Sequence, residues 1–95
     1  MAAPKSGRVL NIAGAATTVV KSGAGQLVAI VVNKAVASST ITIYNNTAAS
    51  GTKIATITNP GVLLAAQYAL PYNVAFSIGL TIVTSGADDI TVTYF

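Results

Sequence analysis

The sequence contains no cysteine, no histidine and no glutamate, so Asp88 and Asp89 are its only acidic side chains. Acid–base and nucleophilic catalysis need a titratable group beside a partner, and zinc and copper sites need thiolate or imidazole ligands. Neighbours on a strand point to opposite faces, so Asp88 and Asp89 cannot converge, and a calcium site would need more carboxylates. The sequence therefore predicts a protein that is not an enzyme and has no catalytic, cofactor-binding or metal-binding residues.

Charge of either sign is scarce, because only 7% of the residues are charged while 53% are hydrophobic. The cations are scattered through residues 5–53, and residues 54–87 carry no charged side chain. A nucleic-acid surface clusters its cations and interleaves them with aromatic residues, so we expect no specific nucleic-acid binding. Such a composition indicates a neutral surface of Thr, Ser and Asn, part of which is hidden in an assembly.

Long uninterrupted apolar runs are also missing. The run 28–32 is short, and the uncharged segment 54–87 is interrupted by Asn59-Pro60-Gly61 and by Pro71. A membrane-spanning helix needs about 20 largely apolar residues, so we expect no membrane association. Residues 1–7 have no apolar stretch of the kind found in signal peptides, and we expect them to form a flexible N-terminal arm.

The residues that are abundant, Thr, Val and Ile, favour strands. Glycine and asparagine recur at the spacing of turns in sandwiches and barrels, and the short links indicate antiparallel pairing. We predict an all-β fold, a single antiparallel β-sandwich of about seven or eight strands over residues 8–95, with a small jelly roll as one form of it. The predicted strands cover residues 8–13, 17–21, 26–33, 40–44, 53–58, 74–78, 80–84 and 90–95. Segment 62–70 fits either a helical turn or an irregular edge.

Three local patterns give sharper expectations. Residues 27–32 are apolar on both faces, which predicts a central strand that is covered on both sides. The alternation around Ile41 and Ile43 predicts a half-buried strand with these two side chains inward. Residues 22–25, Ser-Gly-Ala-Gly, predict a turn whose glycines supply positive φ. They do not form a dinucleotide-binding loop, because the third glycine and the following helix are missing.

Candidate contact residues come from the uncharged part of the chain and from the arm. Tyrosine is enriched at protein interfaces because it buries area and keeps a polar group. We expect a packed apolar contact, with Lys5 and Arg8 docking weakly on an acidic neighbour, since an exposed ion pair contributes only about 0–1 kcal/mol. The candidate residues of the apolar contact are Leu63, Leu64, Tyr68, Leu70 and Tyr72. The alternative is that Leu63, Leu64 and Leu70 complete the domain's own core.

Three stretches of the chain, residues 20–33, 40–55 and 76–94, combine glycine, threonine and alternating apolar residues. In this pattern, over roughly residues 8–95, the chain resembles the small β-sandwich virion proteins of tailed bacteriophages, often head decoration or cement proteins. The resemblance implies a structural virion protein that decorates and stabilises a capsid by bridging capsid subunits. It implies no catalytic residue and no cofactor.

The same resemblance implies the partners and the location. The partners would be the major capsid protein or other virion subunits. The uncharged stretch 54–87 and the apolar strand around Ile30 predict a homo-oligomer, and the resemblance favours a trimer. Its place would be the capsid surface of the virion, after synthesis in the host cytoplasm. Two alternatives within phage particles stay open: a receptor- or glycan-binding fibre tip, and a tail or connector component.

Overall fold

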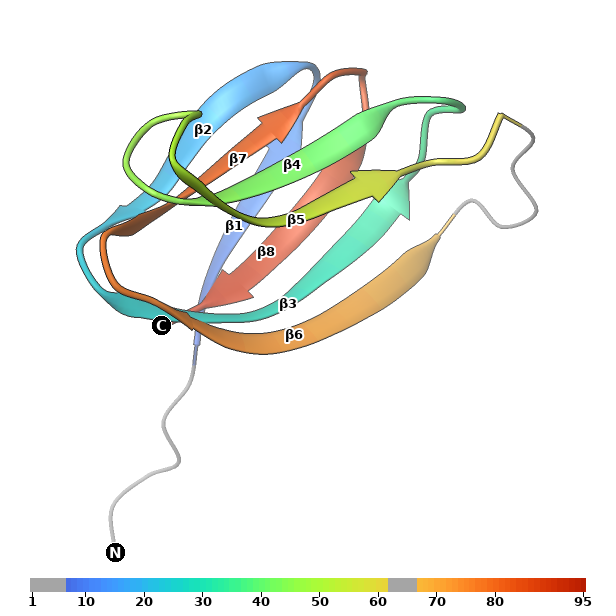
Figure 1. Ribbon diagram of the computed structural model, residues 1–95. Coiled ribbons are helices and arrows are strands. Elements are labelled where there is room, and N and C mark those ends of the chain that lie inside the picture. The colour runs from blue at the N-terminus through green and yellow to red at the C-terminus, as the bar shows by residue number, and fades with distance from the viewer. Residues whose placement is uncertain (1–6, 62–66) are drawn as a thin grey trace, which may run out of the picture.

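The computed structural model describes residues 7–61 and 67–95, and this part of the chain consists of strands and their connections, with no helix (Figure 1). The all-β prediction is therefore confirmed. The strands are β1 (Arg8–Ala13), β2 (Ala16–Ser22), β3 (Gly25–Lys34), β4 (Thr40–Asn45), β5 (Thr52–Thr58), β6 (Tyr68–Phe76), β7 (Gly79–Thr84) and β8 (Asp89–Tyr94).

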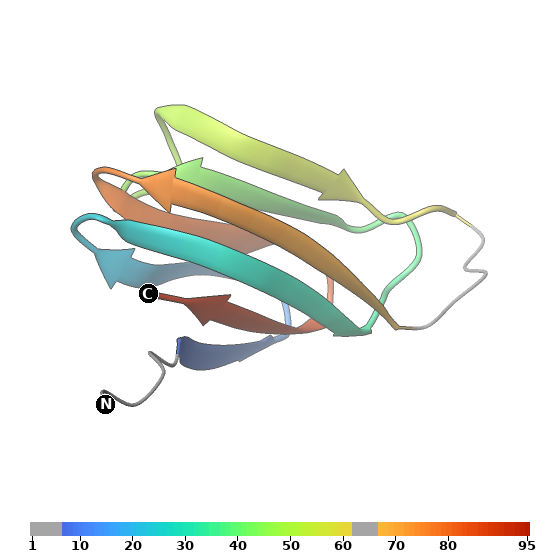
Figure 2. The same cartoon turned by 90° about the horizontal axis from the view of Figure 1, so that it is seen from below.

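The strands form two four-stranded antiparallel sheets that face each other as two layers (Figures 1 and 2). One sheet has the order β1-β8-β3-β6 and the other has the order β2-β7-β4-β5. Four of the strand pairs are nested, so that each pair encloses the next along the chain. From the outermost to the innermost they are β1 with β8, β2 with β7, β3 with β6 and β4 with β5. This is the order of a long hairpin rolled onto itself, which makes the sandwich an eight-stranded jelly roll.

The core lies between the two sheets and is built by side-chain alternation along each strand. Ile41 and Ile43 of β4 have no exposed surface, as predicted. They belong to a buried cluster in which each Val, Leu or Ile side chain contributes about 1.5–3 kcal/mol of burial free energy. From the sheet that contains β3 and β8, this cluster receives Leu27, Ile30, Val32, Ile90 and Val92.

The predicted strand 26–33 is central, as expected, but the expectation that both of its faces are covered is wrong for the single chain. β3 lies between β8 and β6, and Ile30 and Val32 are fully buried. On the opposite face Ala29 and Val31 keep part of their surface exposed. The reason is that each sheet of the sandwich has only one covering layer, so the second apolar face of β3 has no partner within the chain.

The predicted strand 74–78 is wrong in both bounds, because β6 starts at Tyr68 and ends at Phe76. Pro71 interrupts the uncharged segment 54–87 but does not interrupt the strand. β6 is an edge strand, where the missing N–H of proline is tolerated. Its register against β3 shifts near Asn73, which has a positive φ of 51°. Residues 62–66 of the ambiguous segment 62–70 lie outside the described residues.

The turn between β2 and β3 is confirmed at Gly23, which has a φ of +99°. Gly25 has a different role, because it is the first residue of β3. A Cβ atom at this position would lie 2.2 Å from the backbone oxygen of Phe95 and 2.7 Å from the ring of Phe76. Glycine is therefore required here for close approach and not for its conformational freedom.

Candidate interaction surface

The outer face of the β1-β8-β3-β6 sheet carries two rows of small, uncharged side chains. Directly paired residues share a face of a sheet, so the strand register defines these rows. We call this surface the neutral face. Its rows are Val9, Thr93, Ala29, Pro71 and Asn11, Thr91, Val31, Ala69.

The neutral face combines apolar character with exposure. Val9 is 66% exposed, and Ala69 and Pro71 are also exposed. Val31, at the centre, is half-buried although the chain places no second layer over it. A contiguous apolar patch without charge typically marks a contact site, and depletion of charge is what distinguishes the centre of a protein interface.

One end of the neutral face is closed by a polar cluster around Asp89. Its Oδ1 accepts hydrogen bonds from the side-chain amides of Asn11 at 2.7 Å and Asn33 at 3.0 Å. These two hydrogen bonds lower the pKa of Asp89 below its ordinary value, and the bond from Asn11 has the larger effect. The positive charge of Lys34 lowers the pKa further. The carboxylate is thus held ionised and oriented at the rim.

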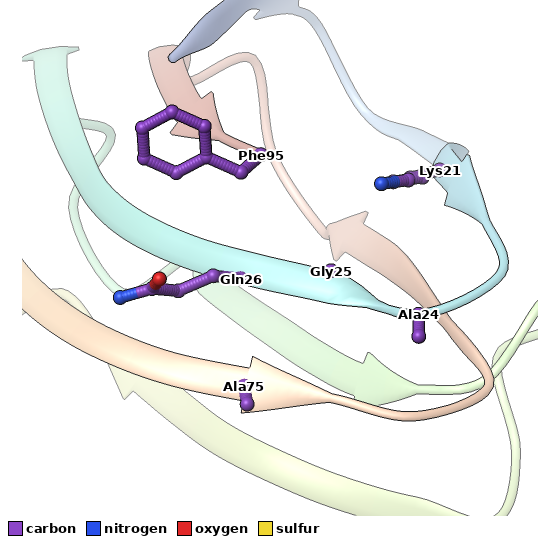
Figure 3. A pocket seen from close by; sticks show the side chains of 6 residues that line it. All are labelled: Lys21, Ala24, Gly25, Gln26, Ala75 and Phe95. Carbon is purple, nitrogen blue, oxygen red and sulfur yellow. The ribbon is translucent and has the colours of Figure 1, made fainter. Parts of the chain in front are cut away.

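The other end of the neutral face opens into a hollow of about 430 Å³ (Figure 3). Phe95 and Gln26 exchange two backbone hydrogen bonds and Gln26 pairs with Ala75, so these three residues form a further row on the same face. Lys21 reaches the hollow from β2 of the other sheet, as Figure 3 shows. The lining residues are Lys21, Ala24, Gly25, Gln26, Ala75 and Phe95.

The outer face of the β2-β7-β4-β5 sheet is richer in threonine, although it also carries Val83 and Val19, which is 50% exposed. Its central row pairs Thr17 with Val83, Val83 with Thr42, and Thr42 with Thr56. The threonine row and the neutral face therefore lie on opposite sides of the sandwich.

The structure separates the predicted contact residues. Tyr68, Leu70 and Tyr72 lie on the core-facing side of β6, because they alternate with exposed residues, and both tyrosines pack against the core. Arg8 is the exposed first residue of β1. Lys5, Leu63 and Leu64 lie outside the described residues, as do residues 1–6 of the expected arm.

Tyr68 also belongs to a buried polar network that sequence reasoning missed. Its hydroxyl donates to Oδ1 of Asn59, whose side-chain amide donates to Asp88 at 3.0 Å. The carboxylate of Asp88 also accepts the backbone N–H of Val36 and the hydroxyl of Ser39, both at 2.7 Å. Asp88 has no exposed surface, and within the described residues every buried side-chain nitrogen or oxygen atom has a hydrogen-bond partner.

This network ties together the turns at one end of the sandwich and favours the neutral form of Tyr68. Desolvation by burial raises the pKa of the Tyr68 hydroxyl, and the charges of Asp88 and Tyr72 raise it further. Burial also raises the pKa of Tyr72. Tyr68 thus has a structural role inside the domain, whereas the sequence made it a candidate contact residue, with a place at the edge of the core as the alternative for the tyrosines.

Within residues 7–61 and 67–95, no group of three His, Cys, Asp or Glu side chains could hold a metal ion. The same described ranges contain no helix that is long and apolar enough to cross a membrane. No protein-family model, no curated protein and no solved structure matches the chain.

The residues of the neutral face come from four strands that are far apart in the sequence, so no short motif could reveal them. One feature of the sequence pointed to the neutral face. The run 27–32 is apolar on both faces, although a strand in a sandwich needs only one apolar face. This run predicts a strand covered on both sides within the chain. The two-sheet topology instead leaves the second apolar face of β3 uncovered.

Proposed function

We propose that the chain is a structural, non-catalytic subunit of a bacteriophage particle, which decorates the capsid surface and stabilises it by bridging capsid subunits. The observation that carries the proposal is the neutral face, an uncharged and partly apolar sheet surface centred on Val31. The likeness in sequence pattern to decoration proteins supports it, and jelly rolls are common in viral capsid proteins. Fold alone does not decide function, and the neutral face is the feature specific to this chain.

The size of the neutral face indicates how such a subunit would hold its place. Strands lie about 4.8 Å apart and rise about 3.3 Å per residue, so two rows across four strands, about four residues along each strand, cover about 250 Å². A stable interface needs about 800 Å² from each partner. One face therefore gives a weak contact, and the proposal includes a homo-oligomer, with a trimer favoured, because linked contacts raise the overall affinity.

Binding of this kind stabilises a shell by mass action. A subunit that binds the assembled capsid, and not its separated parts, lowers the free energy of the assembled state with each bound copy. No chemistry is required of the bound subunit. The scarcity of titratable groups in the sequence is consistent with this role.

The experiment is a quantitative mass-spectrometric count of the chain in purified particles, relative to the major capsid protein. A decoration subunit is expected in numbers comparable to the capsid subunits. A copy number like that of tail proteins would support a tail, connector or fibre-tip role instead. Absence from the particles would refute the proposal.

A further inference from the structure

In the polar cluster that closes one end of the neutral face, the amide donors are all engaged within the chain. The side-chain amide of Asn11 donates to Oδ1 of Asp89 at 2.7 Å and to the backbone oxygen of Ile90 at 3.0 Å. The side-chain amide of Asn33 donates to the same Oδ1 at 3.0 Å and to the hydroxyl of Thr91 at 2.8 Å. Each amide nitrogen carries two hydrogens, so neither asparagine has a donor left for another molecule.

The atoms that remain for a partner are mainly acceptors. They are Oδ2 of Asp89 and the Oδ1 atoms of Asn11 and Asn33, which accept no hydrogen bond from the part of the chain that the structure describes. Asn11 is exposed, and Asn33 and Asp89 are half-buried. Only the hydroxyl of Thr91 keeps a donor hydrogen. The cluster therefore presents three oxygen acceptors together with one negative charge.

This negative charge has no counter-charge in direct contact. Within residues 7–61 and 67–95 Asp89 forms no ion pair, and residues 62–66 contain no charged side chain. Lys34 is the register partner of Asp89 on β3 and lowers its pKa without forming an ion pair with it. The cluster thus lacks the two things that a donor-rich cation would supply, a positive charge and hydrogen-bond donors.

The number and arrangement of the acceptors favour one kind of cation. A guanidinium group has five N–H donors in a rigid plane and can serve several acceptors at once, whereas an ammonium group has three donors on one nitrogen. A calcium ion would need more carboxylates than the single one present. Hydrogen bonds between a guanidinium group and a carboxylate are also among the strongest in proteins.

We propose that the cluster of Asp89, Asn11 and Asn33 receives the guanidinium group of an arginine side chain of the partner subunit. This proposal rests on the function proposed above and names a specific contact within it, because Asn11 and Thr91 are part of the neutral face. The rest of that face is uncharged, and apolar contacts have no direction. One directed, charged contact at its end would fix the orientation in which the partner binds.

The test uses the isotopically labelled chain in solution, titrated with the N-acetyl methylamides of arginine and of citrulline. Citrulline has the same side-chain length but an uncharged urea group. The arginine probe is expected to shift the side-chain amide resonances of Asn11 and Asn33 at least about threefold more than the citrulline probe at equal concentration.

Two variants of equal net charge locate the effect. The difference between the probes should disappear in Asp89→Asn and persist in Thr56→Lys, which also adds one positive unit of charge but lies on the exposed threonine row of the other sheet. In Lys34→Gln the response to arginine should rise about twofold, because a like charge near the cluster is removed.

Equal responses to the two probes, a difference that persists in Asp89→Asn, or a larger response to calcium chloride at equal ionic strength would overturn the assignment. Arg8 is the only arginine of the chain. Weaker self-association of both Arg8→Gln and Asp89→Asn in sedimentation equilibrium would therefore assign the cluster to a second copy and contradict the proposal.

The probe experiment needs no particles, so its result is independent of whether the chain is a virion subunit. In particles assembled without the chain, Asp89→Asn should rebind at least about threefold more weakly than Thr56→Lys, with a smaller dependence on salt concentration. Equal rebinding of the two variants would contradict the arginine contact even if the particle role holds.

Discussion

At the scale of single residues, the largest difference between sequence and structure concerns Asp88. Its neighbours Gly86, Ala87 and Asp89 predict a solvated turn, and a turn does precede β8. The side chain is nevertheless fully buried, because the turns that carry Val36 and Ser39 and the end of β5 at Asn59 converge on it. Such convergence depends on the topology, and no local pattern in the sequence contains it.

Removing the charge of Asp88 should destabilise the protein far more than the same change next to it. In Asp88→Asn an amide N–H₂ group would face donors that now point at a carboxylate, and a buried unsatisfied donor costs about 1–3 kcal/mol. Asp89→Asn is the matched control, because Asp89 lies at the surface end of the neutral face. Denaturant unfolding should show the large loss for Asp88→Asn alone, and similar losses for both would contradict the buried network.

Tyr68 predicts an alkaline limit of stability. Its pKa is raised in the folded state, so its contribution is fully present below the unfolded value of about 10 and is lost as the pH rises through the folded value. Tyr68→Phe should cost about 0.5–1.5 kcal/mol at neutral pH, through the lost hydrogen bond to Asn59, and should weaken the dependence of stability on alkaline pH. Denaturant unfolding at pH 7 and above pH 10 measures both effects. An unchanged pH dependence would show that Tyr68 ionises equally in both states.

Gly25 gives a steric prediction. In Gly25→Ala the new methyl group would clash with the backbone of Phe95 and the ring of Phe76, and overpacking of this kind costs about 1–3 kcal/mol. Gly61→Ala is the control, because among the residues that the structure describes a Cβ atom there would meet only the hydroxyl of Ser38, at 3.5 Å. Thermal unfolding of the two variants compares them, and an equally stable Gly25→Ala would show that the C-terminal end of β8 can move away.

At the scale of strands, alternation and turn residues were sufficient to predict most elements. β1 matches the predicted strand 8–13 in both bounds, and the predicted strand 40–44 differs from β4 by a single residue. The first half of β6 was missed because segment 62–70 fitted either a helical turn or an irregular edge, and the predicted strand began only at residue 74. The physical reason is that an edge strand pairs on one side only, so it tolerates residues that a central strand does not.

The edge strands also explain where much of the scarce charge lies. An unpaired strand edge invites pairing with other chains, and natural proteins protect it with Lys, Arg, Pro or bulges. Arg8 is on β1, Lys21 on β2 and Lys53 on β5, while β6 contains Pro71 and the register shift near Asn73. Each of the four edges therefore has its own protection.

This arrangement predicts a difference in aggregation between two variants of equal net charge. Lys53→Thr removes the cation of the β5 edge, whereas Lys34→Thr removes a cation from the end of the central strand β3. Lys53→Thr should aggregate faster, because the edge of β5 then has no charged residue. Light scattering during mild heating measures this difference. Equally fast aggregation of the two variants would point to net charge as the cause, and faster aggregation of Lys34→Thr would contradict the protection of the β5 edge by Lys53.

At the scale of the whole molecule, the two sheets divide the requirements of the protein between them. The sheet that contains β4 presents threonine outward, and the sheet that contains β3 presents the neutral face. Composition alone predicted both a neutral surface and a contact surface. Only the strand order places the threonine row and the neutral face on opposite sides, since the rows combine residues as distant as Val9 and Thr93.

The most direct test of the proposed contact is a pair of matched charge insertions, one on each outer face. Val31 and Thr42 are both half-buried and both lie on central strands. Each variant, Val31→Lys and Thr42→Lys, is measured for rebinding to particles assembled without the chain, after circular dichroism has shown that it is folded. We predict that Val31→Lys binds at least about tenfold more weakly, a difference of about 1.4 kcal/mol, while Thr42→Lys binds within about twofold of the unaltered chain. Normal rebinding by Val31→Lys together with loss of binding by Thr42→Lys would contradict the account and assign the contact to the threonine face.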